Sequence, residues 1–322
     1  MTIALIGGAG FVGTRLSSVL DGSNKDYKIF DKALSGENYV DITKPETFES
    51  LPQLDVVINL AAEHRDDVTP NSLYDLVNVE GSVNVCNFCR ERGINTIVFT
   101  SSVAVYGFAP EGTDETGEIN YFNDYGRTKY LAENVYRDWY EEDPENRNLV
   151  IVRPTVIFGE ANRGNVYNLL KQIASGKFLM FGNGKNRKSM AYVQNVAEFL
   201  NFSTSLKGYK LYNYIDKPDL DMNTLVSTVR ETLFNKSGVG LRLPASLGKL
   251  AGYCFDIMAF LLRKKLPISS IRVKKFMGTT AFNTSVRDSG FQPSVSLEKG
   301  LKQTLKYEFI EDNSARRTFF TE

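Results

Sequence analysis

A cluster of glycines near the start of the chain constrains the fold more than any other feature. Gly7, Gly10 and Gly13 lie between an apolar run of strand length, residues 2–6, and residues 11–20, whose apolar side chains recur at helical spacing. In such a unit the first glycine makes the turn, the second lets the backbone approach a pyrophosphate, and the third lets helix pack on strand. The turn therefore predicts a dinucleotide whose phosphates lie at the helix N-terminus.

A second predicted strand indicates which dinucleotide binds. Residues 27–30 are followed by Asp31, about 20 residues beyond the turn, where a carboxylate accepts the adenosine ribose hydroxyls. That acid favours NAD over NADP, although the neighbouring Lys32, a further candidate cofactor contact, softens the preference. A purely structural turn followed by a surface aspartate is the alternative interpretation.

Strand and helix patterns alternate through the first half of the chain. Strands are expected at residues 3–6, 28–30, 56–60, 96–100 and 149–152, with helices between them. The pattern predicts a Rossmann-like α/β fold with a doubly wound parallel sheet. At 322 residues the chain is long enough to add a smaller lobe. We expect an NAD-binding domain from residues 1–160, to which 190–215 return, and a substrate-binding lobe from residues 161–189 and 216–322.

Tyr125 and Lys129 are the candidate catalytic pair. Asn123 or Asp124 can cap the helix that follows, and the spacing of four residues puts phenol and ammonium on one helix face. The ammonium and a nicotinium ring both favour phenolate, so we expect the pKa of Tyr125 to move towards the working pH. Ser102, which follows the fourth strand, would orient the substrate hydroxyl and bond to the carbonyl formed as hydride leaves.

Together these motifs resemble those of the extended short-chain dehydrogenases/reductases, in the NAD-dependent epimerase/dehydratase family. The resemblance spans nearly the whole chain and includes GGAGFVG, FTSSVAVYG, YGRTK and VRPTVIFG. It implies tightly bound NAD and a nucleoside-diphosphate sugar as substrate. The glycines, Asp31, Lys32, Tyr125 and Lys129 are cofactor contacts already predicted above. The resemblance adds further ones: Phe11, Val12, Asp41, Ile42, Leu60, Ala61, Ala62, Asn78, Thr100 and Pro154.

The resemblance also implies substrate contacts besides Ser102. Asn165 lies where similar proteins contact the diphosphate, and Arg187 and Lys188 carry the charge to bind its oxygens. A solvated basic loop is the alternative for that pair. His64, the only histidine, follows the third strand and is either a substrate contact or a packing residue.

The predicted function is that of an NAD-dependent nucleoside-diphosphate-sugar epimerase. It would act at C4 of a UDP-hexose or UDP-N-acetylhexosamine, through a transient keto sugar, in surface-polysaccharide biosynthesis. Three alternatives stay open: an NAD(P)-dependent reductase or dehydrogenase of a nucleotide keto sugar, a non-catalytic member that senses nucleotide by binding, and a hydroxysteroid-type dehydrogenase. A homodimer is expected by analogy with the family.

Composition limits the partners and the compartment. Lys+Arg and Asp+Glu both total 38, so no net charge attracts nucleic acid. No stretch reaches membrane-spanning length. Residues 253–262, followed by Arg263, Lys264 and Lys265, form either a lobe helix or a segment lying on a membrane surface. Met1 leads directly into the first strand, so we expect no signal peptide and a cytoplasmic location.

Cys86 and Cys89 form a CxxC pair, a spacing that also occurs in redox and zinc sites. The pair falls well inside a predicted helix, residues 82–92, and no second Cys/His pair accompanies it. We therefore expect two buried packing residues and no metal site.

Overall fold

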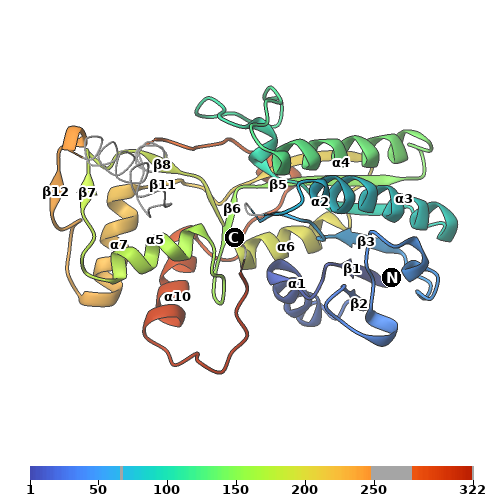
Figure 1. Ribbon diagram of the computed structural model, residues 1–322, viewed down its shortest axis with the longest axis horizontal. Helices are drawn as coiled ribbons and strands as arrows, with labels where there is room; N and C mark the ends of the chain where they lie inside the picture. The colour runs from blue at the N-terminus through green and yellow to red at the C-terminus, as the bar shows by residue number, and fades with distance from the viewer. Residues whose placement is uncertain (66–67, 248–277, 321–322) are drawn as a thin grey trace.

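A six-stranded parallel sheet forms the centre of the protein. The computed structural model describes residues 1–65, 68–247 and 278–320. Its strands run in the order β10-β5-β4-β3-β1-β2, every neighbouring pair parallel (Figure 1). Their bounds are β1 Ile3–Ile6, β2 Tyr27–Phe30, β3 Val56–Asn59, β4 Thr96–Thr100, β5 Asn148–Pro154 and β10 Tyr209–Tyr214. The predicted Rossmann-like α/β class is confirmed.

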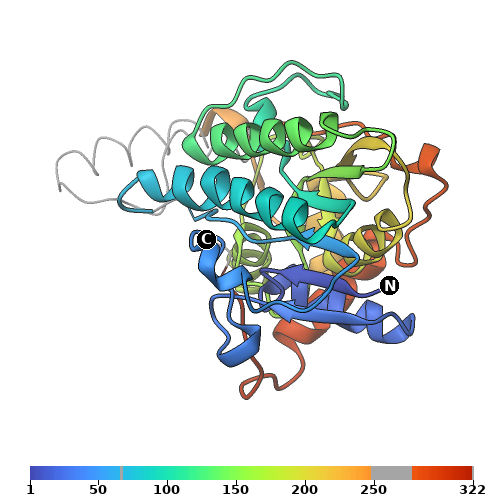
Figure 2. The ribbon, with the colours of Figure 1, turned by 90° about the vertical axis from the view of Figure 1, so that its right-hand side faces the viewer.

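Helices cover both faces of this sheet (Figure 2). On one face lie α1 (Phe11–Gly22) and α6 (Val193–Ser203), which pack against each other. On the other lie α3 (Gly81–Arg92) and α4 (Asp124–Glu141); a short helix α2 (Ser72–Tyr74) and a π-helical segment, Asp75–Glu80, lead into α3. Because both faces are covered, β1, β3 and β5 are buried along their whole length, and they are mostly apolar.

Alternation along each strand divides the core into two layers. Ala4 and Ile6 of β1 pack with the α3 and α4 side chains, such as Phe88. Ile3 and Leu5 of the same strand pack on the opposite face with α1 and α6. This is the two-residue period of a strand whose successive side chains point to opposite faces.

A smaller group of elements lies beyond the carboxyl ends of the strands, on the left of Figure 1. Three helices pack there around a third core: α5 (Asn165–Ala174), α7 (Met222–Phe234) and α10 (Leu297–Phe309). Short strands pair beside them: β6 (Val156–Phe158) with β9 (Met190–Tyr192), β7 (Met180–Phe181) with β12 (Arg242–Leu243), and β8 (Arg187–Lys188) with β11 (Leu220–Asp221). These elements lie beside the carboxyl ends of the strands, where ligands of such folds bind.

The strand predictions agree with the structure to within two residues at each end. No helix of the described residues is long and apolar enough to cross a membrane. The sequence leaves open whether residues 253–265 form a lobe helix or a membrane-surface segment. These residues lie outside the described part of the chain, and so does the third cysteine, Cys254.

Candidate active site

The glycine turn lies at the point where the strand order reverses. From β1 the chain proceeds to β2 on one side and later to β3 on the other, which opens a crevice at their carboxyl ends. Gly7 has a φ of +76°, and a Cβ there would lie 2.6 Å from the Ala61 nitrogen. A Cβ on Gly13 would lie 2.4 Å from the Gly8 oxygen. Only glycine permits these close approaches, so the turn brings the ends of β1 and β3 together.

Two further observations show that this turn and the neighbouring strand end suit a dinucleotide. Helix α1 begins after Gly10 with neither a side-chain cap nor an acidic residue in its first turn, which leaves amide N–H groups for an anion. The Thr100 hydroxyl at the end of β4 is buried and makes no hydrogen bond within the described residues. Because buried hydroxyls nearly always have hydrogen-bond partners, this position at the carboxyl end of β4 suits a polar group of a bound ligand. Phe11 and Val12 form the first residues of α1.

Asp31 and Asp41 are both held by backbone groups. The Asp31 carboxylate accepts hydrogen bonds from the Ala9 nitrogen at 3.1 Å and the Ala33 nitrogen at 2.9 Å. It therefore connects the end of β2 to the glycine turn and retains acceptor capacity for ribose hydroxyls. Lys32 beside it is exposed. The Asp41 carboxylate accepts from the backbone and hydroxyl of Thr43.

Asn78 and Ile42 support the residues that follow β3. The Asn78 amide accepts from the Glu63 nitrogen at 2.8 Å and donates to the Glu63 oxygen and the Thr128 hydroxyl, each at 3.0 Å. All the hydrogen-bonding groups of this side chain thus have protein partners. Because it bonds to both Glu63 and Thr128, it connects the segment of Leu60, Ala61 and Ala62, which Glu63 follows, to α4. Ile42 is buried against Gly81 at the start of α3. Asn78 therefore holds the residues that follow β3, and Ile42 packs against the start of α3.

The start of α4 brings Tyr125 to Ser102. Asn123 is the N-cap, accepting from the Gly126 nitrogen at 2.9 Å, whereas Asp124 pairs with Arg127. A Cβ on Gly126 would lie 2.5 Å from the Ala104 oxygen, so α4 packs tightly on the turn after Ser102. The Ser102 hydroxyl accepts from the Ala104 nitrogen at 3.1 Å, and it lies close enough to the Tyr125 phenol to lower the phenol's pKa.

The protonation states differ from the sequence-based expectation. Burial raises the pKa of Tyr125, and the Ser102 hydroxyl only opposes this. Burial lowers the pKa of Lys129 to about 7, against the raising effect of the Glu133 carboxylate, and its Nζ lies 4.3 Å from the centre of the Phe99 ring. The expectation that Lys129 brings the Tyr125 pKa down was wrong for the protein alone, because desolvation dominates. The charge of a nicotinium ring would act in the lowering direction.

A buried carboxylate that the sequence reasoning missed ties the catalytic elements together. Glu133, one turn beyond Lys129, accepts from the Ser101 hydroxyl at 2.5 Å and from both Nε and Nη2 of Arg153, at 2.7 and 2.6 Å. The same guanidinium donates to the Tyr106 hydroxyl at 2.6 Å. This network joins the end of β4, helix α4 and the end of β5, where Pro154 lies. The spacing of four residues from Lys129 was the available sequence signal.

The predicted substrate contacts are carried by different elements. His64 follows β3, and the pKa of its imidazole is lowered, chiefly by desolvation. Asn165 begins α5. Arg187 lies on β8 in an ion pair with Glu111, so it must exchange that partner to bind a phosphate. Desolvation lowers the pKa of the neighbouring Lys188 to about 8.

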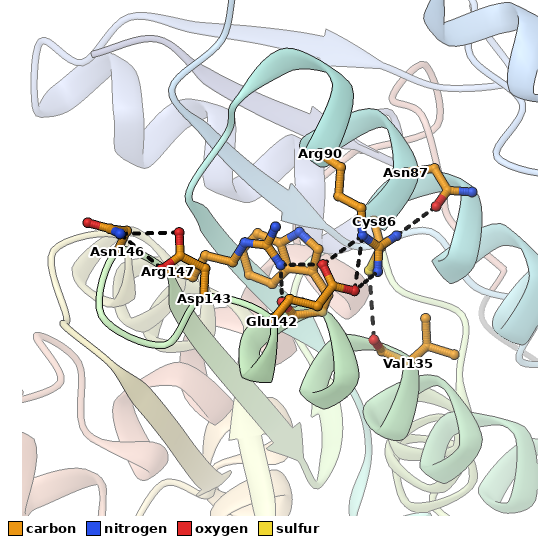
Figure 3. A network of polar contacts seen from close by, with 9 residues as sticks. Cys86, Asn87, Arg90, Val135, Glu142, Asp143, Asn146 and Arg147 are labelled. Carbon is orange, nitrogen blue, oxygen red and sulfur yellow. Dashed lines mark hydrogen bonds and ion pairs between the residues drawn. The ribbon is translucent and has the colours of Figure 1, made fainter.

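The CxxC pair lies in the packed interface of α3 and α4. Both cysteines are buried, and burial raises the pKa of Cys86 to about 12 and that of Cys89 well above its usual value. Cys86 faces the Val135 carbonyl of α4, beside ion pairs that join Arg90 and Arg147 to Glu142 (Figure 3). No cluster able to hold a metal occurs among the residues that the structure describes. The thiols are packing residues, as predicted.

These thiols are expected to resist alkylation in the native protein. Iodoacetamide reacts with thiolate, and a pKa of about 12 leaves almost none at pH 8. In a Cys254→Ser background, we expect Cys86 and Cys89 to remain unlabelled natively and to be fully labelled in 6 M guanidinium, as measured by mass spectrometry. Rapid native labelling would contradict the packed interface.

The sheet is doubly wound and carries the glycine turn at its switch point. Ser102, Tyr125 and Lys129 lie near the end of a neighbouring strand. Together these features define a Rossmann-type enzyme that uses a dinucleotide. The model of the NAD dependent epimerase/dehydratase family matches residues 3–209, and the chain belongs to this family.

Relatives and solved structures agree with this assignment. The chain is 49% identical to the N-acetyl-alpha-D-glucosaminyl-diphospho-ditrans,octacis-undecaprenol 4-epimerase of Escherichia coli O157:H7, over 99% of both chains. It is 27% identical to the UDP-glucose 4-epimerase of Vibrio cholerae, over 97% of both. A Thermotoga maritima UDP-glucose 4-epimerase with UDP-glucose shares the fold at a TM-score of 0.72 and 20% identity, covering 95% of this chain and 98% of that one. The family predicted from the sequence is therefore confirmed.

Proposed function

We propose that this enzyme interconverts the C4 epimers of an N-acetylhexosamine linked through diphosphate to a polyprenyl carrier. The observation that carries this proposal is the 49% identity, over 99% of both chains, to an epimerase whose name specifies such a substrate. The UDP-glucose 4-epimerase relative is only 27% identical. The diphosphate expected from the sequence is retained, and the group beyond it changes from a nucleoside to a lipid.

The chemistry rests on Tyr125 and Ser102. Bound NAD supplies the hydride acceptor, and later the hydride donor, for C4. The Tyr125 phenolate takes the proton of the C4 hydroxyl, while the Ser102 hydroxyl bonds to the oxygen that becomes a carbonyl. In the reverse transfer, the Tyr125 phenol would return its proton to the C4 oxygen, which the Ser102 hydroxyl holds in place. The complete cycle consumes no oxidant. Lys129 would hold the ribose of the bound NAD.

Epimerisation of defined substrates tests the proposal. N-acetylglucosaminyl-diphospho-polyprenol in detergent, UDP-N-acetylglucosamine and UDP-glucose are offered at equal concentration, and the C4 epimers are separated after mild acid release. We expect the lipid-linked sugar to reach an epimer equilibrium, and both UDP-sugars to react at least tenfold more slowly. Faster conversion of a UDP-sugar would refute the lipid carrier and favour the nucleotide.

A label separates epimerase from reductase. With deuterium at C4 and no added NAD(H), an epimerase returns the label to the product, because one bound cofactor takes and gives the hydride. Loss of deuterium, or turnover only with added reduced cofactor, would support the keto-sugar reductase alternative.

We further propose how the chain is organised and where it acts. Residues 1–160 and 190–215 form the NAD-binding part, supported by the sheet to which β10 belongs, and residues 161–189 and 216–322 bind the sugar and its carrier.

A homodimer would form through α3 and α4; light scattering should then give twice 36.1 kDa. Two free, buried thiols are compatible with a reducing cytoplasm.

A further inference from the structure

The last described residues of the chain return to the nucleotide turn. Beyond α10, the chain loops away and runs back towards β6 and α6, in red in Figure 1. Phe319 forms a parallel bridge with Asn162; its nitrogen donates to the Ala161 oxygen at 2.8 Å, and its oxygen accepts from the Arg163 nitrogen at 2.7 Å. We call residues 313–320 the C-terminal strap.

The Phe319 side chain reaches the cofactor turn itself. Its ring centre lies 5.9 Å from that of Phe11, the first residue of α1 and the one that follows Gly10. The Arg317 guanidinium lies 4.8 Å from the centre of the Phe319 ring, on the same strap. An aromatic contact of this geometry fixes both rings, and Phe11 carries one of the amides at the phosphate-binding end of α1.

The loop held by the strap connects three parts of the site. In residues 159–164, Glu160 forms an ion pair with Arg15 of α1 at 2.9 Å. The Ala161 nitrogen and the Arg163 guanidinium both bind Glu308 of α10. The loop leads directly into α5. Phe319 is the only residue described here that both pairs with this loop through its backbone and contacts Phe11 through its ring.

We propose that Phe319 is a positioning residue that clamps this loop onto the nucleotide turn and slows the release of NAD. Retention matters in an epimerase, because the nicotinamide that accepts the hydride must stay to return it. Loss of the reduced cofactor between the two transfers would strand the keto sugar. The inference rests on the family's use of NAD and is independent of the carrier attached to the sugar.

Phe319→Ala tests the proposal, with Phe320→Ala as the matched control because Phe320 is 71% exposed. We measure the NAD copurified per chain and the rate of NADH dissociation, followed by its fluorescence in the absence of sugar. Loss of this half-buried aromatic contact predicts about tenfold faster dissociation. We expect no change in Phe320→Ala, and recovery in Phe319→Tyr. An unchanged rate in Phe319→Ala, or an equal effect in both alanine variants, would overturn the proposal.

A measurement on the wild-type protein guards against a variant that fails to fold. If the strap stabilises bound NAD, then NAD must stabilise the strap, since coupling is reciprocal. Hydrogen exchange at the amides of Phe319 and Arg163 should therefore be slower with NAD than in protein stripped of cofactor. Equal exchange at both amides in the two states would refute the clamp. Since no sugar is present in either experiment, failure here is distinguishable from failure of the proposed substrate.

Discussion

Replacing Tyr125 with phenylalanine is expected to lower the rate of C4 epimerisation by roughly 10²- to 10⁴-fold, the range for loss of a general acid–base. The phenol lies beside Ser102, whose hydroxyl lowers its pKa, and phenylalanine removes only the oxygen. Bound NAD should stay at the wild-type level, and stability should fall by only about 1 kcal/mol, the usual value of one hydrogen bond. Turnover is measured on the lipid-linked sugar, with NAD content and thermal unfolding alongside.

Tyr140→Phe is the matched control, since Tyr140 lies near the other end of the same helix. It should retain full turnover. If Tyr125→Phe remained equally active, the acid–base assignment would be wrong. If wild type and variant both bound NAD without converting any diphosphate sugar, the chain would be a binding member of the family. Because burial raises the Tyr125 pKa, we also expect the wild-type rate to increase with pH across the neutral range as phenolate forms.

Gly13→Ala is expected to cause the largest loss of NAD binding. The new methyl group would lie 2.4 Å from the Gly8 oxygen and 2.5 Å from its Cα, both backbone atoms, so the turn itself must move. Overpacking of this kind costs about 1–3 kcal/mol of stability. A displaced turn also misdirects the amides at the start of α1, and we expect no NAD to copurify.

Gly22→Ala provides the comparison within the same helix, because a Cβ at Gly22 meets nothing within 4 Å. Its stability should be unchanged or higher by up to about 1 kcal/mol, the helix preference for alanine. Thermal unfolding and absorbance of released NAD report both effects. Similar behaviour of the two variants would show that close packing at Gly13 does not govern the site.

Much of the fold and part of the site were predictable because their signals are local. The run into Gly7, the helical spacing after Gly10 and the acid at Asp31 each lie within one strand–turn–helix–strand unit, so periodicity and turn chemistry suffice. Tyr125 and Ser102 were predicted as partners from their residue chemistry and position, before the resemblance was considered, and the structure brings the two side chains close together. Their catalytic roles remain predictions that the variants above test.

Other parts of the site could not be predicted, because they depend on side chains from several elements. Glu133 is an ordinary helical glutamate in the sequence, yet in the fold it meets Ser101, which follows β4, and Arg153 of β5 with no exposure to water. Arg187 was predicted as a phosphate ligand from the resemblance and its charge. The loop that brings Glu111 to it lies far away in sequence.

The sequence by itself determined the order of strands and helices, the dinucleotide turn and the residues available for proton transfer, because backbone preferences and hydrophobic periodicity are properties of short segments. Only the tertiary structure shows the direction in which the pKa values of those residues shift. Burial raises the pKa of Tyr125 and lowers that of Lys129, in opposition to the expectation drawn from their spacing. It also decided that Phe319 meets Phe11 across almost the full length of the chain. Desolvation and long-range contacts depend on which segments the fold packs together, and no local pattern encodes them.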